Sequence, residues 1–277
     1  MQTQAGRHRS VLAEMARNPV SGAPASSVLL VPAASMEPEY AIGTYVRAFQ
    51  SMGVDQADVL DVRTRADAQR PSRASVELLR RAEVVLFTGG DQERLSGILR
   101  DTPLHAALKA AFESGAQVAG TSAGAVAMAE VMHFAPADES ANNAHLVDTA
   151  PGLGLLTGVF VDTHFTERQR LGRLFALVTA EPERIGLGLD EDTAVIVTGR
   201  RAVVVGRSSV TVVDGRPLLQ DRHGGVHLHL LRSGDAYDLD TGVPTFGAGA
   251  ARQPERPRVT QAGRRTEQSL ELIDERR

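Results

Sequence analysis

Two similar stretches decide the fold: AEVVLFTGGDQ at residues 82–92 and QVAGTSAGAVAMA at residues 117–129. In each, a short apolar run with high β propensity passes through glycines into a polar or helix-forming segment. The second stretch contains Gly120-x-Ser122-x-Gly124, the pattern of a nucleophile elbow, in which a serine occupies a tight strand-to-helix turn. The flanking glycines let the backbone pass close by, and the following helix directs N–H groups toward the serine hydroxyl. The pattern is weak alone, because a helix that begins with small residues gives the same letters.

Strands and helices alternate through the first 130 residues. We expect strands at 28–32, 58–62, 84–87 and 117–119, and helices at 38–52, 74–82, 94–99 and 104–114. Short apolar strands separated by helices predict an α/β fold, with a doubly wound, mostly parallel sheet and helices on both faces. Ligands of such sheets bind outside the carboxyl ends of the strands. Ser35, Gly89–Gln92 and Ser122 all follow such ends, which favours a catalytic role for the serine.

The pattern changes after Met132. Residues 133–143 are polar and are expected to form a loop, whereas residues 159–162 predict a strand. The helix that follows has four apolar side chains at core spacing, namely Leu171, Leu174, Phe175 and Val178. Later apolar runs predict a C-terminal β meander. We therefore expect an N-terminal segment (1–27), a single α/β domain (28–245) and a C-terminal tail (246–277), with a surface helix at 267–277 as an alternative to disorder.

The composition excludes several classes of function. The 277 residues include no cysteine, which excludes a thiolate nucleophile or a zinc–thiolate site. The net charge of −4, with both signs scattered, argues against a nucleic-acid or membrane partner. No apolar run could span a bilayer and no secretory signal is evident, so a cytoplasmic location is expected. No cofactor is expected either: Gly152-x-Gly154 lacks the third glycine of a dinucleotide site, and His227-x-His229 lacks a convincing third metal ligand.

A serine nucleophile needs a base within hydrogen-bond reach and a third group that orients the base. Of the eight histidines, only His164 directly follows an expected strand end and precedes a helix. The acidic partner is best sought in Asp190-Glu191-Asp192, although such a run is more often a solvated hairpin tip. Gly186 and Gly188, just before this run, would let a backbone or a ligand approach closely.

Three arginines follow His164 by four, six and nine residues: Arg168, Arg170 and Arg173. On a helix, Arg170 and Arg173 would share a face. Guanidinium groups suit the recognition of carboxylates, but the same spacing is compatible with an exposed basic face.

Four motifs, in this order, carry a family resemblance. They are Gly-Gly-Asp-Gln at 89–92, Gly-Thr-Ser-Ala-Gly-Ala at 120–125, Asp-Thr-His-Phe with Arg-x-Arg-x-x-Arg-Leu at 162–174, and Gly-Leu-Asp-Glu-Asp-Thr-Ala at 188–194. With them, the chain resembles the cyanophycinases and their relatives over about residues 28–214. These are serine peptidases of family S51, related to aspartyl dipeptidases, with a fold akin to class I glutamine amidotransferases.

The resemblance implies a role for each matching residue. Ser122 would be the nucleophile, His164 the general base and Glu191 the carboxylate that orients it. The oxyanion hole would be formed by backbone N–H groups of Gly90, Asp91 and Ala123. The β-aspartyl-arginine unit of the substrate would be held by Gln92, Asp162, Thr163, Arg168, Arg170 and Arg173. The implied reaction is hydrolysis of an isopeptide-branched Asp/Arg polymer to β-Asp-Arg dipeptides through an acyl-enzyme, and relatives suggest a homodimer.

Two departures from the family pattern bear on this expectation. Thr163 stands where a cyanophycinase usually has glutamine, so the substrate could instead be another aspartyl peptide. The first strand of the family, normally ahead of residues 4–17, is missing from the pattern. The alternatives are therefore an aspartyl or isoaspartyl dipeptidase acting on short peptides, or a non-catalytic binding relative.

Overall fold

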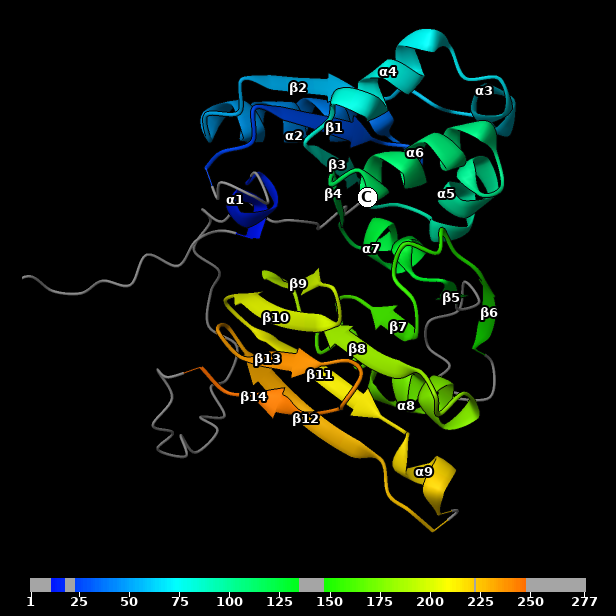
Figure 1. Cartoon of the computed structure of the whole chain (residues 1–277), viewed down its shortest axis with the longest axis vertical. Coiled ribbons are helices and arrows are strands. Elements are labelled where there is room, and N and C mark those ends of the chain that lie inside the picture. Colours follow the sequence, from blue (N-terminus) through cyan, green and yellow to red (C-terminus); the bar gives the residue numbers. More distant parts are fainter. Residues whose placement is uncertain (1–10, 18–22, 135–146, 222, 248–277) are drawn as a thin grey trace, which may run out of the picture.

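The computed structural model describes residues 11–17, 23–134, 147–221 and 223–247. Its first half is a parallel sheet covered by helices, and its second half consists mainly of antiparallel strands (Figure 1). The expected missing first strand concerns residues 1–10 in part, and the expected tail is mostly 248–277. Both expectations therefore lie largely outside the described residues and stay predictions.

The parallel sheet has the strand order β2-β1-β3-β4. Its members are β1 (Ser27–Val31), β2 (Gln56–Val59), β3 (Val84–Phe87) and β4 (Gln117–Gly120). The chain moves from β1 to β2 on one side and then returns to β3 on the other side. The carboxyl ends of β1 and β3 therefore lie at a switch point, the place where sheets of this class bind ligands.

Helices cover both faces of this sheet. The helices α1 (Val11–Met15) and α2 (Pro38–Ser51) lie on one face, where Phe49 packs with Val28 and Leu30 of β1. The helices α3 (Arg65–Gln69), α4 (Arg73–Arg81), α5 (Gln92–Leu99) and α6 (Pro103–Glu113) contribute to the opposite core, with Leu29 and Val31 of β1. Because successive strand residues point to opposite faces, a strand buried on both sides has a continuous apolar sequence.

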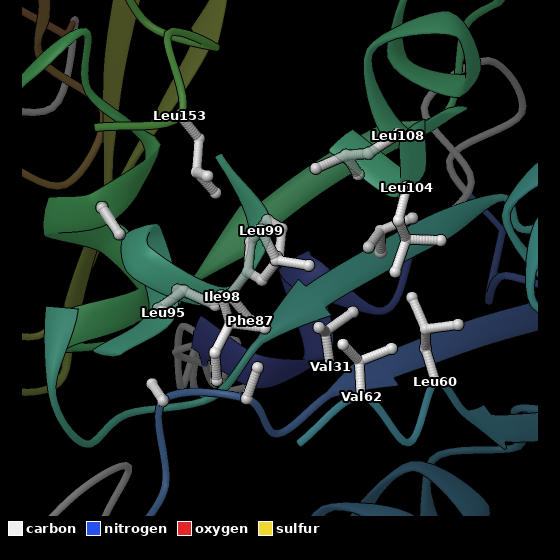
Figure 2. Packing of buried hydrophobic residues seen from close by; sticks show 14 of the residues in the cluster. Val31, Leu60, Val62, Phe87, Leu95, Ile98, Leu99, Leu104, Leu108 and Leu153 are labelled. Carbon is white, nitrogen blue, oxygen red and sulfur yellow. The ribbon is translucent and has the colours of Figure 1, made fainter. Parts of the chain in front are cut away.

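Figure 2 shows the second of these cores at close range. A cavity of only about 10 Å³ in this core is lined by five leucines, Val31 and Phe87. The lining is entirely apolar, and a void of this size is at the lower limit for a single water molecule. The sheet that carries the candidate site therefore rests on closely packed side chains.

The second half begins with α7 (Ala123–Met128) and the antiparallel pair β5 (Val131–Phe134) and β6 (Asp148–Pro151). A mixed sheet follows in the order β12-β11-β8-β7, in which only β7 (Val159–Asp162) and β8 (Ile185–Leu189) are parallel. Its other strands are β11 (Ser209–Asp214) and β12 (His227–Arg232), and α8 (Leu171–Ala180) packs on it.

The last sheet is an antiparallel meander in the order β14-β13-β10-β9. It consists of β9 (Thr193–Thr198), β10 (Arg201–Gly206), β13 (Ala236–Asp238) and β14 (Pro244–Thr245), and the short α9 (Pro217–Gln220) lies between β11 and β12 in sequence. The predicted α/β class, the helix-covered parallel sheet and the C-terminal meander are confirmed. The strands after Met132 are more antiparallel than expected.

Three local predictions were wrong. The strand expected at 58–62 is β2, which begins two residues earlier and ends three residues earlier. His133 and Phe134 belong to β5 rather than to a loop, and the rest of the expected loop, 135–143, lies outside the described residues. Leu171 and Phe175 are exposed on α8, whereas Leu174 and Val178 are buried as predicted. A stripe of four apolar residues is wider than the part of the helix that touches the sheet.

Candidate active site

Ser122 lies at the turn between β4 and α7, which is the expected nucleophile elbow. Its backbone has φ 49° and ψ −119°, a conformation that is unfavourable for any residue with a Cβ atom. Such outliers persist only where the surroundings impose them, and they cluster at functional sites.

Steric crowding explains why glycine stands at both Gly120 and Gly124. A Cβ atom on Gly124 would lie 2.5 Å from the carbonyl oxygen of Phe87 and 2.8 Å from that of Thr88. A Cβ atom on Gly120 would lie 2.5 Å from backbone atoms of Gly124. The start of α7 is therefore pressed against the end of β3, and only glycine permits this approach.

The three residues implied as catalytic are in contact. Ser122 Oγ lies 3.0 Å from Nε2 of His164, and His164 Nδ1 lies 3.1 Å from Oε1 of Glu191. The imidazole is almost fully buried, whereas the Glu191 carboxylate is half exposed. A carboxylate on Nδ1 selects the tautomer in which Nε2 is free to accept a proton, so the arrangement has the geometry of a serine–histidine–carboxylate triad.

His164 is held by its neighbours in sequence. Its φ is 48°, and the next residue, Phe165, donates its N–H to the carbonyl oxygen of Leu189 at 3.1 Å. A Cβ atom on Gly188 would lie within 2.6 Å of the Phe165 ring. Gly188 thus makes room for a side chain of the histidine turn, and Gly186 does the same for Leu174 and Val178 of α8. The close approach that these glycines predicted is made by side chains of the protein.

Asp190 and Glu191, which follow β8, have different environments. Asp190 is buried and accepts hydrogen bonds from the N–H of Thr166 and the hydroxyls of Ser208 and Ser209. Burial opposes ionisation of Asp190, but these three donors outweigh it and lower its pKa. Asp190 therefore fixes the turn, and Glu191 is the carboxylate that reaches His164.

Two of the three candidate oxyanion donors keep their N–H groups available. The Asp91 N–H donates to the carbonyl oxygen of Ala34 at 3.0 Å, and the Asp91 side chain caps α5 through Glu93 and Arg94. The N–H groups of Gly90 and Ala123 make no hydrogen bond within the described residues. Ala123 N–H belongs to the first turn of α7, where a developing negative charge is favoured.

Asp162 is the centre of a buried ion cluster at the end of β7. Its side chain has no exposed surface, and Arg173 binds it through two nitrogens, with Nε 2.9 Å from Oδ2 and Nη2 on Oδ1. Arg170 Nη1 lies 3.2 Å from the same Oδ1 and donates to the carbonyl oxygen of Thr163 at 2.7 Å. The three described side chains of this cluster carry one negative and two positive charges, before and after His164 in the chain.

The remaining candidates surround the same site. Gln92 opens α5, directly after the loop of Gly90, and its Nε2 donates to the carbonyl oxygen of His133 at 3.2 Å. Thr163 is buried between Asp162 and His164. Arg168 lies in the turn before α8, where its backbone N–H donates to the His164 carbonyl oxygen. Thr163 therefore adjoins His164 in the chain, Gln92 is linked through His133 to the end of β7, and Arg168 is exposed in the turn after His164.

The sequence and the structure are similar to those of known peptidases. The sequence matches the model of peptidase family S51 over residues 4–205. The chain belongs to peptidase family S51. A cyanophycinase from Trichormus variabilis is 40% identical over 79% of this chain and 77% of the relative, and one from Geminocystis herdmanii is 37% identical over 79% of this chain and 85% of the relative. The crystal structure of a peptidase from an acI-B1 actinobacterium has the same fold, with a TM-score of 0.63 at 24% identity, covering 82% of this chain and 89% of that one.

The S51 assignment makes the chain a peptidase of the hydrolase class. Within the described residues, no three metal-ligating side chains come together, and no helix has the length and apolar character needed to cross a membrane. The His227 and His229 rings contact each other on β12, far along the chain from the S51 motifs.

One residue at this S51 site was missed by sequence reasoning. His133 is buried in β5, its Nε2 lies 3.1 Å from the carbonyl oxygen of Val161, and the same nitrogen lies 3.6 Å from Oδ1 of Asp162. Burial, reinforced by the charges of Arg173 and Arg170 and opposed by Asp162, lowers its pKa to about 4. The only available signal was its position after the apolar pair Val131-Met132, which also fits a loop start.

Proposed function

We propose that this S51 peptidase is a serine exopeptidase that hydrolyses cyanophycin, the β-aspartyl-arginine polymer, to β-Asp-Arg dipeptides. The observation that carries the proposal is the contact chain from Ser122 Oγ to His164 and from His164 to Glu191, at 3.0 and 3.1 Å. Both distances lie in the range expected for a nucleophile and its base before substrate binds.

In the first half of the reaction, Ser122 Oγ attacks the carbonyl carbon of the amide that joins one aspartyl unit to the next. The hydroxyl proton passes to Nε2 of His164, and Glu191 on Nδ1 stabilises the imidazolium that forms. The carbonyl oxygen takes the negative charge and accepts hydrogen bonds from the N–H groups of Gly90 and Ala123. When the C–N bond breaks, the leaving nitrogen takes the proton from His164, and an ester to Ser122 remains.

In the second half, water attacks the ester carbonyl carbon and gives its proton to Nε2 of His164. The C–O bond to Ser122 then breaks, the proton returns to Oγ, and a carboxylic acid leaves the site. The enzyme is restored, and one water is consumed for each dipeptide released.

Support for the substrate comes from the relatives and from the charge of the site. The relatives named cyanophycinase are 37–40% identical over most of the chain. The cluster of Asp162, Arg170 and Arg173 brings two guanidinium groups to the end of β7, and guanidinium groups suit a substrate rich in carboxylates. Gln92 supplies an amide with donor and acceptor atoms, which suits the amide groups of the substrate. Arg168 is assigned to the outer part of the substrate because it lies on the exposed side of the histidine turn.

Thr163 is the observation that favours a second candidate. Its short side chain replaces the glutamine expected at this position, and it leaves one long amide fewer for substrate recognition. The second candidate is an aspartyl or isoaspartyl dipeptidase that acts on short peptides.

Parallel assays separate these candidates. Purified protein is incubated with cyanophycin, β-Asp-Arg, β-Asp-Lys and α-aspartyl dipeptides, and the products are identified by mass spectrometry. Release of β-Asp-Arg from cyanophycin supports the first candidate, and cleavage of dipeptides alone supports the second. A non-catalytic relative would cleave none of them, and a serine-reactive probe would fail to label Ser122. Homodimer formation also stays a prediction, and the mass of the protein in solution tests it.

A further inference from the structure

His133 stands between two groups of side chains that the proposed function assigns to the substrate. The strand β5 contacts α5, which carries Gln92, and β7, which carries Asp162. The backbone carbonyl oxygen of His133 accepts the hydrogen bond from Gln92 Nε2, and its imidazole faces Val161 and Asp162. Two halves of the site, from different parts of the chain, thus meet at one residue.

The hydrogen bond to Gln92 fixes the orientation of the side-chain amide. With Nε2 donating to the His133 carbonyl oxygen, Oε1 is the atom left without a partner among the described residues. Because amide oxygen and nitrogen are assigned from such contacts, a donor in the substrate would meet an acceptor here.

The imidazole of His133 contacts the end of β7, at Val161 and Asp162. The carbonyl oxygen of Val161 can only accept, so the proton of a neutral His133 ring must lie on Nε2. That N–H also points its positive end toward the Asp162 carboxylate, 3.6 Å away, which is an electrostatic contact and not a hydrogen bond. Val161 and Asp162 are the last residues of β7, and Thr163 and His164 follow them directly.

Asp162 connects His133 to the two arginines, because its carboxylate contacts all three side chains. It is fully buried, and both Arg170 and Arg173 bind it with only 13% and 15% of their side chains exposed. The Asp162 carboxylate accepts three hydrogen bonds from the two guanidinium groups, so it fixes the direction of both arginines.

We propose that His133 is a positioning residue for substrate binding, which holds the end of β7 and the Asp162 carboxylate so that Arg170 and Arg173 are aimed at the substrate. The inference rests on the proposed function, since it needs a substrate that the arginines bind. It adds a residue that does not itself touch the reacting atoms, because the nucleophile already has its base in His164.

The test compares three variants with wild type. His133→Ala removes the ring, whereas His133→Gln keeps an N–H donor close to the position of Nε2. The backbone carbonyl that binds Gln92 is present in both, so only the imidazole is tested. His105→Gln is the matched control, because His105 is also buried and its Nε2 also contacts a backbone carbonyl, that of Leu153, but it lies on α6 away from Asp162.

We expect His133→Ala to raise KM for the cleaved aspartyl substrate about tenfold or more, with kcat changed by less than about threefold. His133→Gln should restore most of the loss in KM, and His105→Gln should leave KM unchanged. The rate at which a small fluorophosphonate labels Ser122 should be the same in all four proteins, because that probe does not use the arginines.

Two results would overturn the inference while the proposed function stands. One is a wild type that turns over cyanophycin while His133→Ala lowers kcat and probe labelling with KM unchanged. The other is a His133→Gln variant that folds, by circular dichroism, but shows no recovery of KM. If His133→Ala does not fold, His133→Leu takes its place, because leucine fills the space of the ring without an N–H donor. A raised KM in His133→Leu that His133→Gln restores supports the inference, and a KM equal to that of wild type in both overturns it. A wild type that cleaves no aspartyl substrate overturns the proposed function, and this inference with it.

Discussion

Ser122 and His164 meet at 3.0 Å, and both have backbones in the positive-φ region, at 49° and 48°. Each costs on the order of 1–3 kcal/mol compared with a relaxed backbone. The strain places the hydroxyl and the imidazole opposite each other from two separate turns. Activity and stability should therefore respond differently when the serine is replaced.

Ser122→Gly should be more stable than Ser122→Ala, and both should be inactive. Glycine tolerates φ 49° without a Cβ clash, which favours the Ser122→Gly variant, whereas its larger unfolded-state entropy opposes this gain. The net difference in the free energy of unfolding between the two variants should be about 1 kcal/mol. Urea unfolding of the two variants measures this difference. A Ser122→Ala variant that is the more stable of the two would contradict the strain.

Gly124→Ala should cost both stability and activity. The new Cβ atom would lie 2.5 Å from the Phe87 carbonyl oxygen, so the start of α7 has to move away from β3 and Ser122 moves with it. We expect kcat to fall at least about tenfold, since small displacements at a catalytic group are costly.

Gly97→Ala is the matched control for this change. Gly97 lies within α5 and nothing stands within 4 Å of its Cβ position, so alanine should stabilise the protein by up to about 1 kcal/mol. Equal effects of the two substitutions on kcat would show that the contact with β3 is unimportant.

Glu191→Gln should lower kcat by about a hundredfold or more with little change in KM, because a neutral amide neither selects the tautomer nor stabilises the imidazolium. Asp192→Asn is the control: it removes the adjacent carboxylate at a position with φ 55°, which asparagine tolerates. Steady-state kinetics of both variants on the same substrate is the measurement. A fall in kcat for Asp192→Asn as large as that for Glu191→Gln would assign the role to the local charge as a whole.

His133 should make stability depend on pH. Its pKa of about 4 in the folded protein lies below the unfolded value near 6.5, so the unfolded chain binds the proton more readily between these values. The stabilisation is complete above about pH 6.5, falls as the pH is lowered, and is lost below about pH 4, by up to about 3 kcal/mol in all. In the part of the chain that the structure describes, the charged groups that act on the ring are Asp162, Arg170 and Arg173.

The free energy of unfolding of wild type and His133→Gln, measured from about pH 7.5 to pH 4, isolates this contribution. The other titrating groups, such as Asp190 and Asp214, are common to both proteins and cancel in the difference. We expect the wild type to lose stability more steeply than His133→Gln. Parallel curves would show that the imidazole is not buried in its neutral form.

Much of the fold follows from local sequence. The run Val84–Phe87 is apolar throughout, which is what a strand covered on both faces requires, and β3 has these limits. Glycines mark its end in the sequence, and in the structure Asp91 follows them and caps α5. Ser122, His164 and Glu191 could be selected from the sequence because the motifs that contain them are short and have a fixed order.

The ion cluster of Asp162, Arg170 and Arg173 could not be predicted from the sequence, because it depends on tertiary contacts. Asp162 and Arg173 are eleven residues apart, and nothing in their spacing shows that the carboxylate is fully buried between two guanidinium groups. His133 reaches the same cluster from another strand, 29 residues earlier in the chain. The exposed Phe175 shows the same limit, since helical periodicity gives the apolar face but not the width of its contact with the sheet.

The release of β-Asp-Arg from cyanophycin, by wild type and by Ser122→Ala at equal concentration, tests the central claim most directly. The account predicts that the dipeptide accumulates with wild type and that no release above background occurs with Ser122→Ala, although both proteins are folded. Release by Ser122→Ala at the wild-type rate, or a wild type that releases no dipeptide, would contradict it.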